Sequence, residues 1–195
     1  MTTQRISLEK IDPSSFVRRD FAYSLLLFLL GAATLTWAVI ERGADAPLPG
    51  IWLCMFFLAY GLFTISMGYE HPQVGYVSFD RVAQVASILV LGPLVAALIA
   101  GLASLLFPLA RLARGVPFSS VLTAALHNAG LMALMVLVCG SAYVKLGGAV
   151  PLTYIEWPSM ISLVLLLFMM QAFNDIGMRL MASIRDLSVP RDVSL

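Results

Sequence analysis

Charged residues are scarce in this sequence. Only 12% of its 195 residues are Asp, Glu, Lys or Arg, whereas soluble domains carry about 25%. Hydrophobic residues make up 60%, and the mean hydropathy is +0.91. A soluble fold of this length could not bury that much apolar surface, so the composition predicts an integral membrane protein.

Clustered positive charge is also missing. The formal net charge is +1, so the chain lacks the basic surface that would follow nucleic-acid phosphates, and we expect no nucleic-acid partner. The two cysteines, Cys54 and Cys139, lie in separate apolar blocks without metal-ligand spacing and are interpreted as small buried residues. Because no zinc spacing, phosphate loop or nucleophile elbow is present, we expect a protein that is not an enzyme, and no cofactor is indicated.

The apolar residues occur in blocks long enough to cross a hydrocarbon core about 30 Å thick, which takes about 20 helical residues. Alternating segments of about ten residues, typical of barrels, are absent. The pattern therefore predicts an all-α, polytopic bundle of transmembrane helices. The expected spans cover residues 21–40, 50–69, 74–91, 94–112, 118–144 and 158–182.

Polar residues flank this expected bundle of residues 21–182. Residues 1–20 contain Arg5, Lys10, Arg18 and Arg19 and predict a cytoplasmic amphipathic segment with a short helix on the membrane surface. The first apolar block is too long and too far from the start to be a cleaved signal peptide. Residues 183–195 are expected to form a polar cytoplasmic tail.

The number of spans depends on Gly92 and Pro93, which interrupt the third apolar region. A single kinked helix there would give five spans, and a turn would give six. Basic residues near span ends favour the cytoplasm. With six spans, the richer segments (residues 1–20, Arg111 with Arg114, and the tail) all lie inside, while Arg42 and Lys145 lie outside. We therefore expect six spans and cytoplasmic termini.

Ionisable groups inside the hydrocarbon region are costly and usually face a cavity, pair with each other or serve a function. Three polar pairs, which are named at the end of this paragraph, lie at similar positions within their expected spans. At 1.5 Å per residue, these positions are about 10 to 15 Å from the cytoplasmic boundary. Three further residues lie one helical turn from a pair member and could contact it: Gln84, Gln171 and Arg179. The pairs are Asp80 with Arg81, His127 with Asn128, and Asn174 with Asp175.

Two interpretations of this expected cluster remain open. The polar residues form a pocket for a small polar ligand or a proton-sensitive switch, in which His127 titrates most easily near neutral pH. Alternatively, they form a clasp that only fixes helix register.

Small residues line one face of the fourth expected span, and their spacing permits close helix approach. They either pack within the chain or dock another subunit. The residues are Ala96, Ala97, Ala100 and Gly101.

The stretches VSFDRVAQVASILVLGPLVAALIAGLASLL, LHNAGLMALMVLVCGSAYVKLGG and FMMQAFNDIGMRLMASI resemble the membrane input regions that precede GGDEF or HD-type output domains in bacterial signalling proteins. This resemblance implies sensing in a bacterial inner membrane. Because the sequence ends at Leu195 without an output domain, we expect it to act through a separate membrane subunit or a second copy of itself.

Two other functions remain open. The length, the six spans and the Gly-Pro break are similar to the substrate-binding membrane components of energy-coupling vitamin transporters, which implies a pocket that opens outward. An accessory or scaffold subunit of a larger membrane complex needs no binding site.

Overall fold

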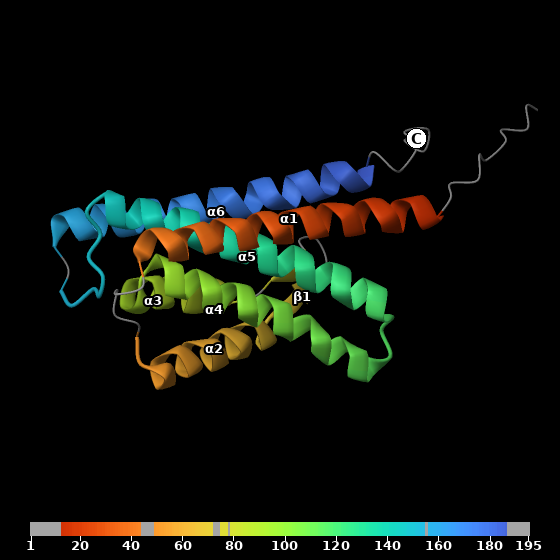
Figure 1. Ribbon diagram of the computed structural model, residues 1–195, viewed down its shortest axis with the longest axis horizontal. Helices are drawn as coiled ribbons and strands as arrows, with labels where there is room; N and C mark the ends of the chain where they lie inside the picture. The colour runs from red at the N-terminus through yellow and green to blue at the C-terminus, as the bar shows by residue number, and fades with distance from the viewer. Residues whose placement is uncertain (1–12, 44–48, 72–74, 78, 155, 187–195) are drawn as a thin grey trace, which may run out of the picture.

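The computed structural model describes residues 13–43, 49–71, 75–77, 79–154 and 156–186, which form an elongated helix bundle (Figure 1). Within these residues the elements are α1 (Pro13–Arg42), α2 (Ile51–Ser66), β1 (Tyr69–His71), β2 (Gly75–Val77), α3 (Asp80–Leu91), α4 (Pro93–Leu106), the 3-10 helix η1 (Phe107–Arg114), α5 (Phe118–Lys145) and α6 (Trp157–Asp186). The expected helical fold is therefore present, with one small hairpin added.

Four helical segments are long and apolar enough to cross a membrane, which is consistent with an integral membrane protein. They cover residues 19–42, 93–114, 118–145 and 159–181. The apolar helix α2 is shorter, with 16 residues, and α3 has 12. At 1.5 Å per residue these two helices are about 24 and 18 Å long, less than the hydrocarbon thickness.

The third expected span begins later than predicted. Residues 75–77 do not start a helix, because they pair with Tyr69–His71 as an antiparallel hairpin. Tyr and Val favour extended structure, and both occur in the strand Gly75–Val77. The helix itself begins at Asp80, so Asp80 lies at a helix start rather than two turns inside a span.

A break separates α3 from α4, as the turn interpretation predicted. Gly92 ends α3 with φ +85°, a conformation that glycine adopts without strain. Pro93 occupies the first turn of α4, where its missing N–H costs nothing.

The N-terminal region differs from the expectation. The described residues 13–20, which were expected to belong to a separate surface helix, continue into α1 without a break. The reason is physical: the stretch lacks a glycine or internal proline that would end the helix before the apolar block. Residues 1–12 and the tail residues 187–195 lie outside the described residues, while residues 183–186 belong to α6.

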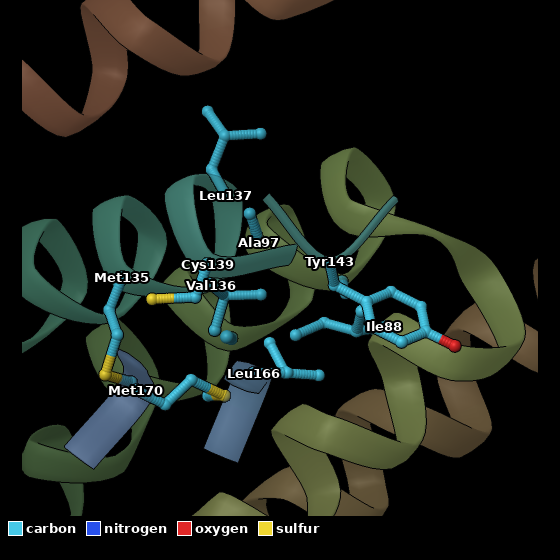
Figure 2. Close-up of a cluster of buried hydrophobic side chains, with 11 residues drawn as sticks. Ile88, Ala97, Met135, Val136, Leu137, Cys139, Tyr143, Leu166 and Met170 are labelled. Atoms are coloured by element: carbon cyan, nitrogen blue, oxygen red, sulfur yellow. The ribbon is translucent and has the colours of Figure 1, made fainter. Parts of the chain in front are cut away.

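Helix α5 is the centre of the bundle. Figure 2 shows its side chains Met135, Val136 and Tyr143 beside Ile88 of α3 and Leu166 of α6. All five are fully or almost fully buried. Helices α1, α3, α4 and α6 therefore pack around α5, and the outer helices carry the exposed apolar side chains that lipid would cover.

Glycines allow α5 to approach its neighbours closely. A Cβ atom on Gly130 would lie 2.6 Å from the backbone of Leu27 in α1, and one on Gly101 of α4 would lie 3.2 Å from the Cβ atom of Ala133. The expected small-residue face is buried within the chain, through Ala96, Ala97, Ala100 and Gly101. These residues thus pack against other helices of the same chain.

The connection between α5 and α6 is fastened to the bundle. The Tyr143 hydroxyl donates a hydrogen bond to the Ala149 carbonyl oxygen at 3.0 Å, and the Ser162 hydroxyl donates one to the Leu146 carbonyl oxygen at 2.7 Å. The Leu152 N–H donates to the Leu89 carbonyl oxygen at 2.9 Å. These bonds connect α3, α5 and α6 at one end of the bundle.

Candidate functional site

Asp80 and Gln84 form the polar start of α3. The Gln84 amide nitrogen donates a hydrogen bond to the Asp80 carboxylate at 2.9 Å and contacts the Met132 sulfur of α5 at 3.2 Å. The sequence predicted the first contact from the spacing of four residues. Asp80 also lies in the first turn of α3, where the helix dipole favours a negative charge.

The side of α3 that carries Asp80 and Gln84 borders a small cavity between α2, α3 and α4. Its volume is about 20 Å³, which is room for a water molecule or an ion of similar size. Phe57, Ile65 and Ile99 contribute apolar walls. The polar lining comes from Asp80, Gln84, Ser87 and Ser104.

Gln84 has an unusual position in this cavity. Its side chain is only 5% exposed, and its carbonyl oxygen Oε1 is buried with no hydrogen-bond partner among the described residues. The amide orientation follows from chemistry, because the Asp80 carboxylate accepts hydrogen bonds and therefore faces the NH₂ group. An unmatched buried acceptor costs about 1 to 3 kcal/mol, so a donor or cation at Oε1 would be stabilising.

Arg81 follows Asp80 on α3. It is half-buried and lies within electrostatic range of Asp80, of Cys139 in α5 and of Asp175 in α6. The two carboxylates thus influence Arg81 electrostatically, while the convergence of the three polar pairs stays a prediction.

The polar residues of α6 lie mainly on its outer face. The Gln171 amide donates a hydrogen bond to the Asp175 carboxylate at 2.8 Å, and both side chains are exposed. Asn174 is partly buried, and Arg179 is exposed. Of the α6 residues that were expected in the polar cluster, only Asn174 is therefore partly buried.

His127 and Asn128 separate from each other. His127 is buried, at 8% exposed, and its ring centroid lies 5.6 Å from that of Tyr23 in α1. Asn128 is exposed, because adjacent residues on a helix point about 100° apart. The pair thus divides between the interior and the surface of the bundle.

Asp20 is an interior polar residue that the sequence did not single out. It is 9% exposed, and its carbonyl oxygen accepts a hydrogen bond from the Ser24 hydroxyl at 2.7 Å. Its position directly before the first apolar block suggested a boundary residue. The sequence feature that could have indicated burial of Asp20 is Ser24, one helical turn later, because residues four apart lie on the same helix face.

These residues form hydrogen bonds and electrostatic interactions with one another. Among the described residues, no group of three or more His, Cys, Asp or Glu side chains is arranged to hold a metal ion. The cavity lining includes the polar residues Asp80, Gln84, Ser87 and Ser104, but apolar residues form most of its surface.

Comparison of the chain with protein-family models, with curated proteins and with solved structures gives no match.

Proposed function

We propose that this protein is a non-enzymatic membrane module that senses a small polar ligand or a change in charge and acts through a partner chain. In this proposal it crosses the bacterial inner membrane six times, with both termini in the cytoplasm. The partner is a separate membrane subunit or a second copy of the chain.

The course of the helices supports six passes. In Figure 1, the start of α1, the end of α6 and the η1–α5 turn lie at one end of the bundle, and the α1–α2, α3–α4 and α5–α6 connections lie at the other. Arg111 and Arg114 belong to the first end, and Arg42 and Lys145 to the second. The positive-inside rule then favours a cytoplasmic location for the first end.

The observation that supports the sensing proposal is that half-buried Arg81 lies within electrostatic range of Asp80 on its own helix and of Asp175 on α6. A charged side chain in an apolar bundle is stable only while its partners are in place. Any change in charge at either carboxylate would alter the attraction between α3 and α6. Because α6 carries exposed apolar side chains such as Phe168, its displacement would change a surface that a partner can contact.

The two other functions have less support from the described residues. A cavity of about 20 Å³ is far below the roughly 300 to 1,000 Å³ of small-molecule sites, so a vitamin-sized substrate has no evident place. The small-residue face that a scaffold could use for docking is already buried within the chain.

The experiment measures association and its dependence on Arg81. The tagged chain is purified in mild detergent from its native membranes, and light scattering gives the protein mass of the particle. We expect a mass well above the 21.1 kDa of one chain, a smaller particle for Arg81→Gln, and restoration by Arg81→Lys. The matched control is Arg111→Gln, which removes the same charge from the exposed η1 helix.

Two results would contradict the proposal. One is a wild-type particle that contains a single chain. The other is equal loss of association in Arg81→Gln and Arg111→Gln, because the position of Arg81 would then have no special role.

A further inference from the structure

We propose that α6 pairs side by side, and in the same direction, with α6 of a second copy of the chain. The pairing surface is the outer face of α6, where exposed side chains follow one another every three or four residues: Ile161, Val164, Phe168, Gln171 and Asp175. This inference rests on the proposed function, because it names the partner and the surface that the partner contacts.

Two polar residues of this outer face lie well inside the apolar span. Gln171 lies 12 residues after Ser159 and 10 residues before Met181, the ends of the span, which is about 18 and 15 Å of helix. Asp175 lies 6 residues before Met181, or about 9 Å. A charged or amide side chain that faces lipid at such depths is costly, and it usually contacts a cavity or a neighbouring helix. The outer face of α6 is therefore more stable against a polar partner than against lipid.

The hydrogen bond between these two residues does not use all of their polar atoms. The Gln171 amide donates to the Asp175 carboxylate at 2.8 Å, and both side chains are exposed. A primary amide has a second hydrogen and an acceptor oxygen, and a carboxylate accepts further bonds. By contrast, the exposed hydroxyls of Thr36 in α1 and Ser66 in α2 donate to carbonyl oxygens of their own helices. Gln171 and Asp175 thus retain hydrogen-bonding capacity for an outside partner.

A second copy supplies polar groups at the required depths. Two copies in one membrane have the same orientation, so equal residues of a two-fold pair lie at equal depth. Steps of seven residues connect Ile161, Phe168 and Asp175, and another connects Val164 with Gln171. This is the repeat of a helix–helix seam, in which each side chain inserts between residues of the facing helix. The second amide hydrogen of Gln171 can then donate to Asp175 of the other copy.

The charges near this seam do not oppose the pairing. The two Asp175 carboxylates approach each other in the pair and would repel if they were alone. However, Arg179 is exposed one helical turn after Asp175, and Arg81 of α3 is within electrostatic range of the same carboxylate. Each copy thus brings two cationic side chains near its Asp175. The carboxylate on which Arg81 acts would therefore also belong to the pairing surface.

Disulfide cross-linking in membranes tests the pairing. Two versions of the full chain with tags of different size are co-expressed, and Cys54 and Cys139 are replaced by alanine in both. Val164→Cys then places one thiol on the seam, at a position that is 64% exposed. Because a disulfide requires Cβ atoms about 3.5 to 4.5 Å apart, oxidation should join the two versions only if the outer faces of α6 meet.

The matched control is Phe56→Cys in α2. Phe56 is 59% exposed and lies 5 residues after Ile51, the start of α2, just as Val164 lies 5 residues after Ser159. Both helices start at the same end of the bundle (Figure 1), so the two thiols lie at similar depth. Phe56→Cys should remain unlinked.

Gln171→Leu tests the polar contact itself. Leucine is stable against lipid, so this variant should keep its fold, which circular dichroism verifies. We expect the dissociation constant of the pair to rise about 3- to 30-fold through the loss of interhelical hydrogen bonds. Energy transfer between labelled copies in a series of detergent dilutions measures it. The control Thr36→Val removes an exposed hydroxyl from α1 and should leave the constant unchanged.

Three results would overturn the inference: no cross-link with Val164→Cys, equal cross-linking with Phe56→Cys, or an unchanged dissociation constant for Gln171→Leu. The particle mass from light scattering separates this failure from failure of the proposed function. A particle larger than one chain, together with any of the three results, would leave the proposed function standing with a different partner surface. A particle of one chain would contradict both proposals.

Discussion

Replacement of Gly130 by alanine tests the packing that holds α1 against α5. The added Cβ atom would lie 2.6 Å from the carbonyl carbon and oxygen of Leu27 and from the Phe28 nitrogen. All three are backbone atoms, so no side-chain rotation can relieve the contact. The helices must move apart, by about 1 Å, to restore normal van der Waals separation.

The expected cost follows from two opposing effects. Overpacking of this kind destabilises a protein by about 1 to 3 kcal/mol, and the higher helix propensity of alanine offsets about 0.8 to 1 kcal/mol of it. Because the contact is with backbone, we expect a net loss of about 1 to 2 kcal/mol. For a chain of this size that corresponds to a Tm lower by about 2 to 8 °C.

Circular dichroism during thermal unfolding in detergent measures the change. The control is Gly61→Ala in α2, because a Cβ atom there would meet only the Ala103 Cβ atom, at an ordinary 3.5 Å. Gly61→Ala should be neutral or stabilising. A Gly130→Ala protein as stable as the wild type would refute the close packing of α1 on α5.

Three further predictions concern stability and shape. Tyr143→Phe removes the hydrogen bond to Ala149 and should lower the free energy of unfolding by about 0.5 to 1.5 kcal/mol, measured by denaturant titration; an unchanged value would mean that the bond is not formed. Met170→Ala should cost about 2 to 5 kcal/mol because Met170 is fully buried, whereas Phe168→Ala, 71% exposed on the same helix, should cost less, and equal costs would contradict the orientation of α6. Gly92→Ala places a side chain at φ +85° and should lower Tm, since non-glycine residues are strained there; an unchanged Tm would mean that the α3–α4 turn has another conformation.

Most helices could be predicted from the sequence because each long apolar block has one stable conformation in a membrane. A helix satisfies all its backbone hydrogen bonds internally, so α5 and α6 occur close to residues 118–144 and 158–182 as expected. The break at Gly92 and Pro93 was also predictable, since both residues are specific to such a turn.

The hairpin at Tyr69–His71 and Gly75–Val77 could not be separated from an apolar span by composition. A three-residue strand is too short to establish an alternating pattern, and its pairing depends on contacts beyond the local sequence.

The candidate site was predictable only within single helices. Spacing of four residues identified the Asp80–Gln84 and Gln171–Asp175 contacts. It could not determine that Asn128 is exposed or that Asp20 is buried, because helix rotation depends on the shape of all neighbouring side chains. The close approach of α1 and α5 at Gly130 determines one such rotation.

The proposed topology is a six-pass bundle with the α1 start and the η1–α5 turn on the cytoplasmic side of the membrane. The most direct measurement is labelling of single introduced cysteines at Gly115 and Gly147, both in exposed turns, in a background where Cys54 and Cys139 are replaced by alanine. A membrane-impermeant maleimide should label Gly147→Cys in intact cells and Gly115→Cys only after permeabilisation. Labelling of Gly115→Cys in intact cells, with Gly147→Cys protected, would contradict the account.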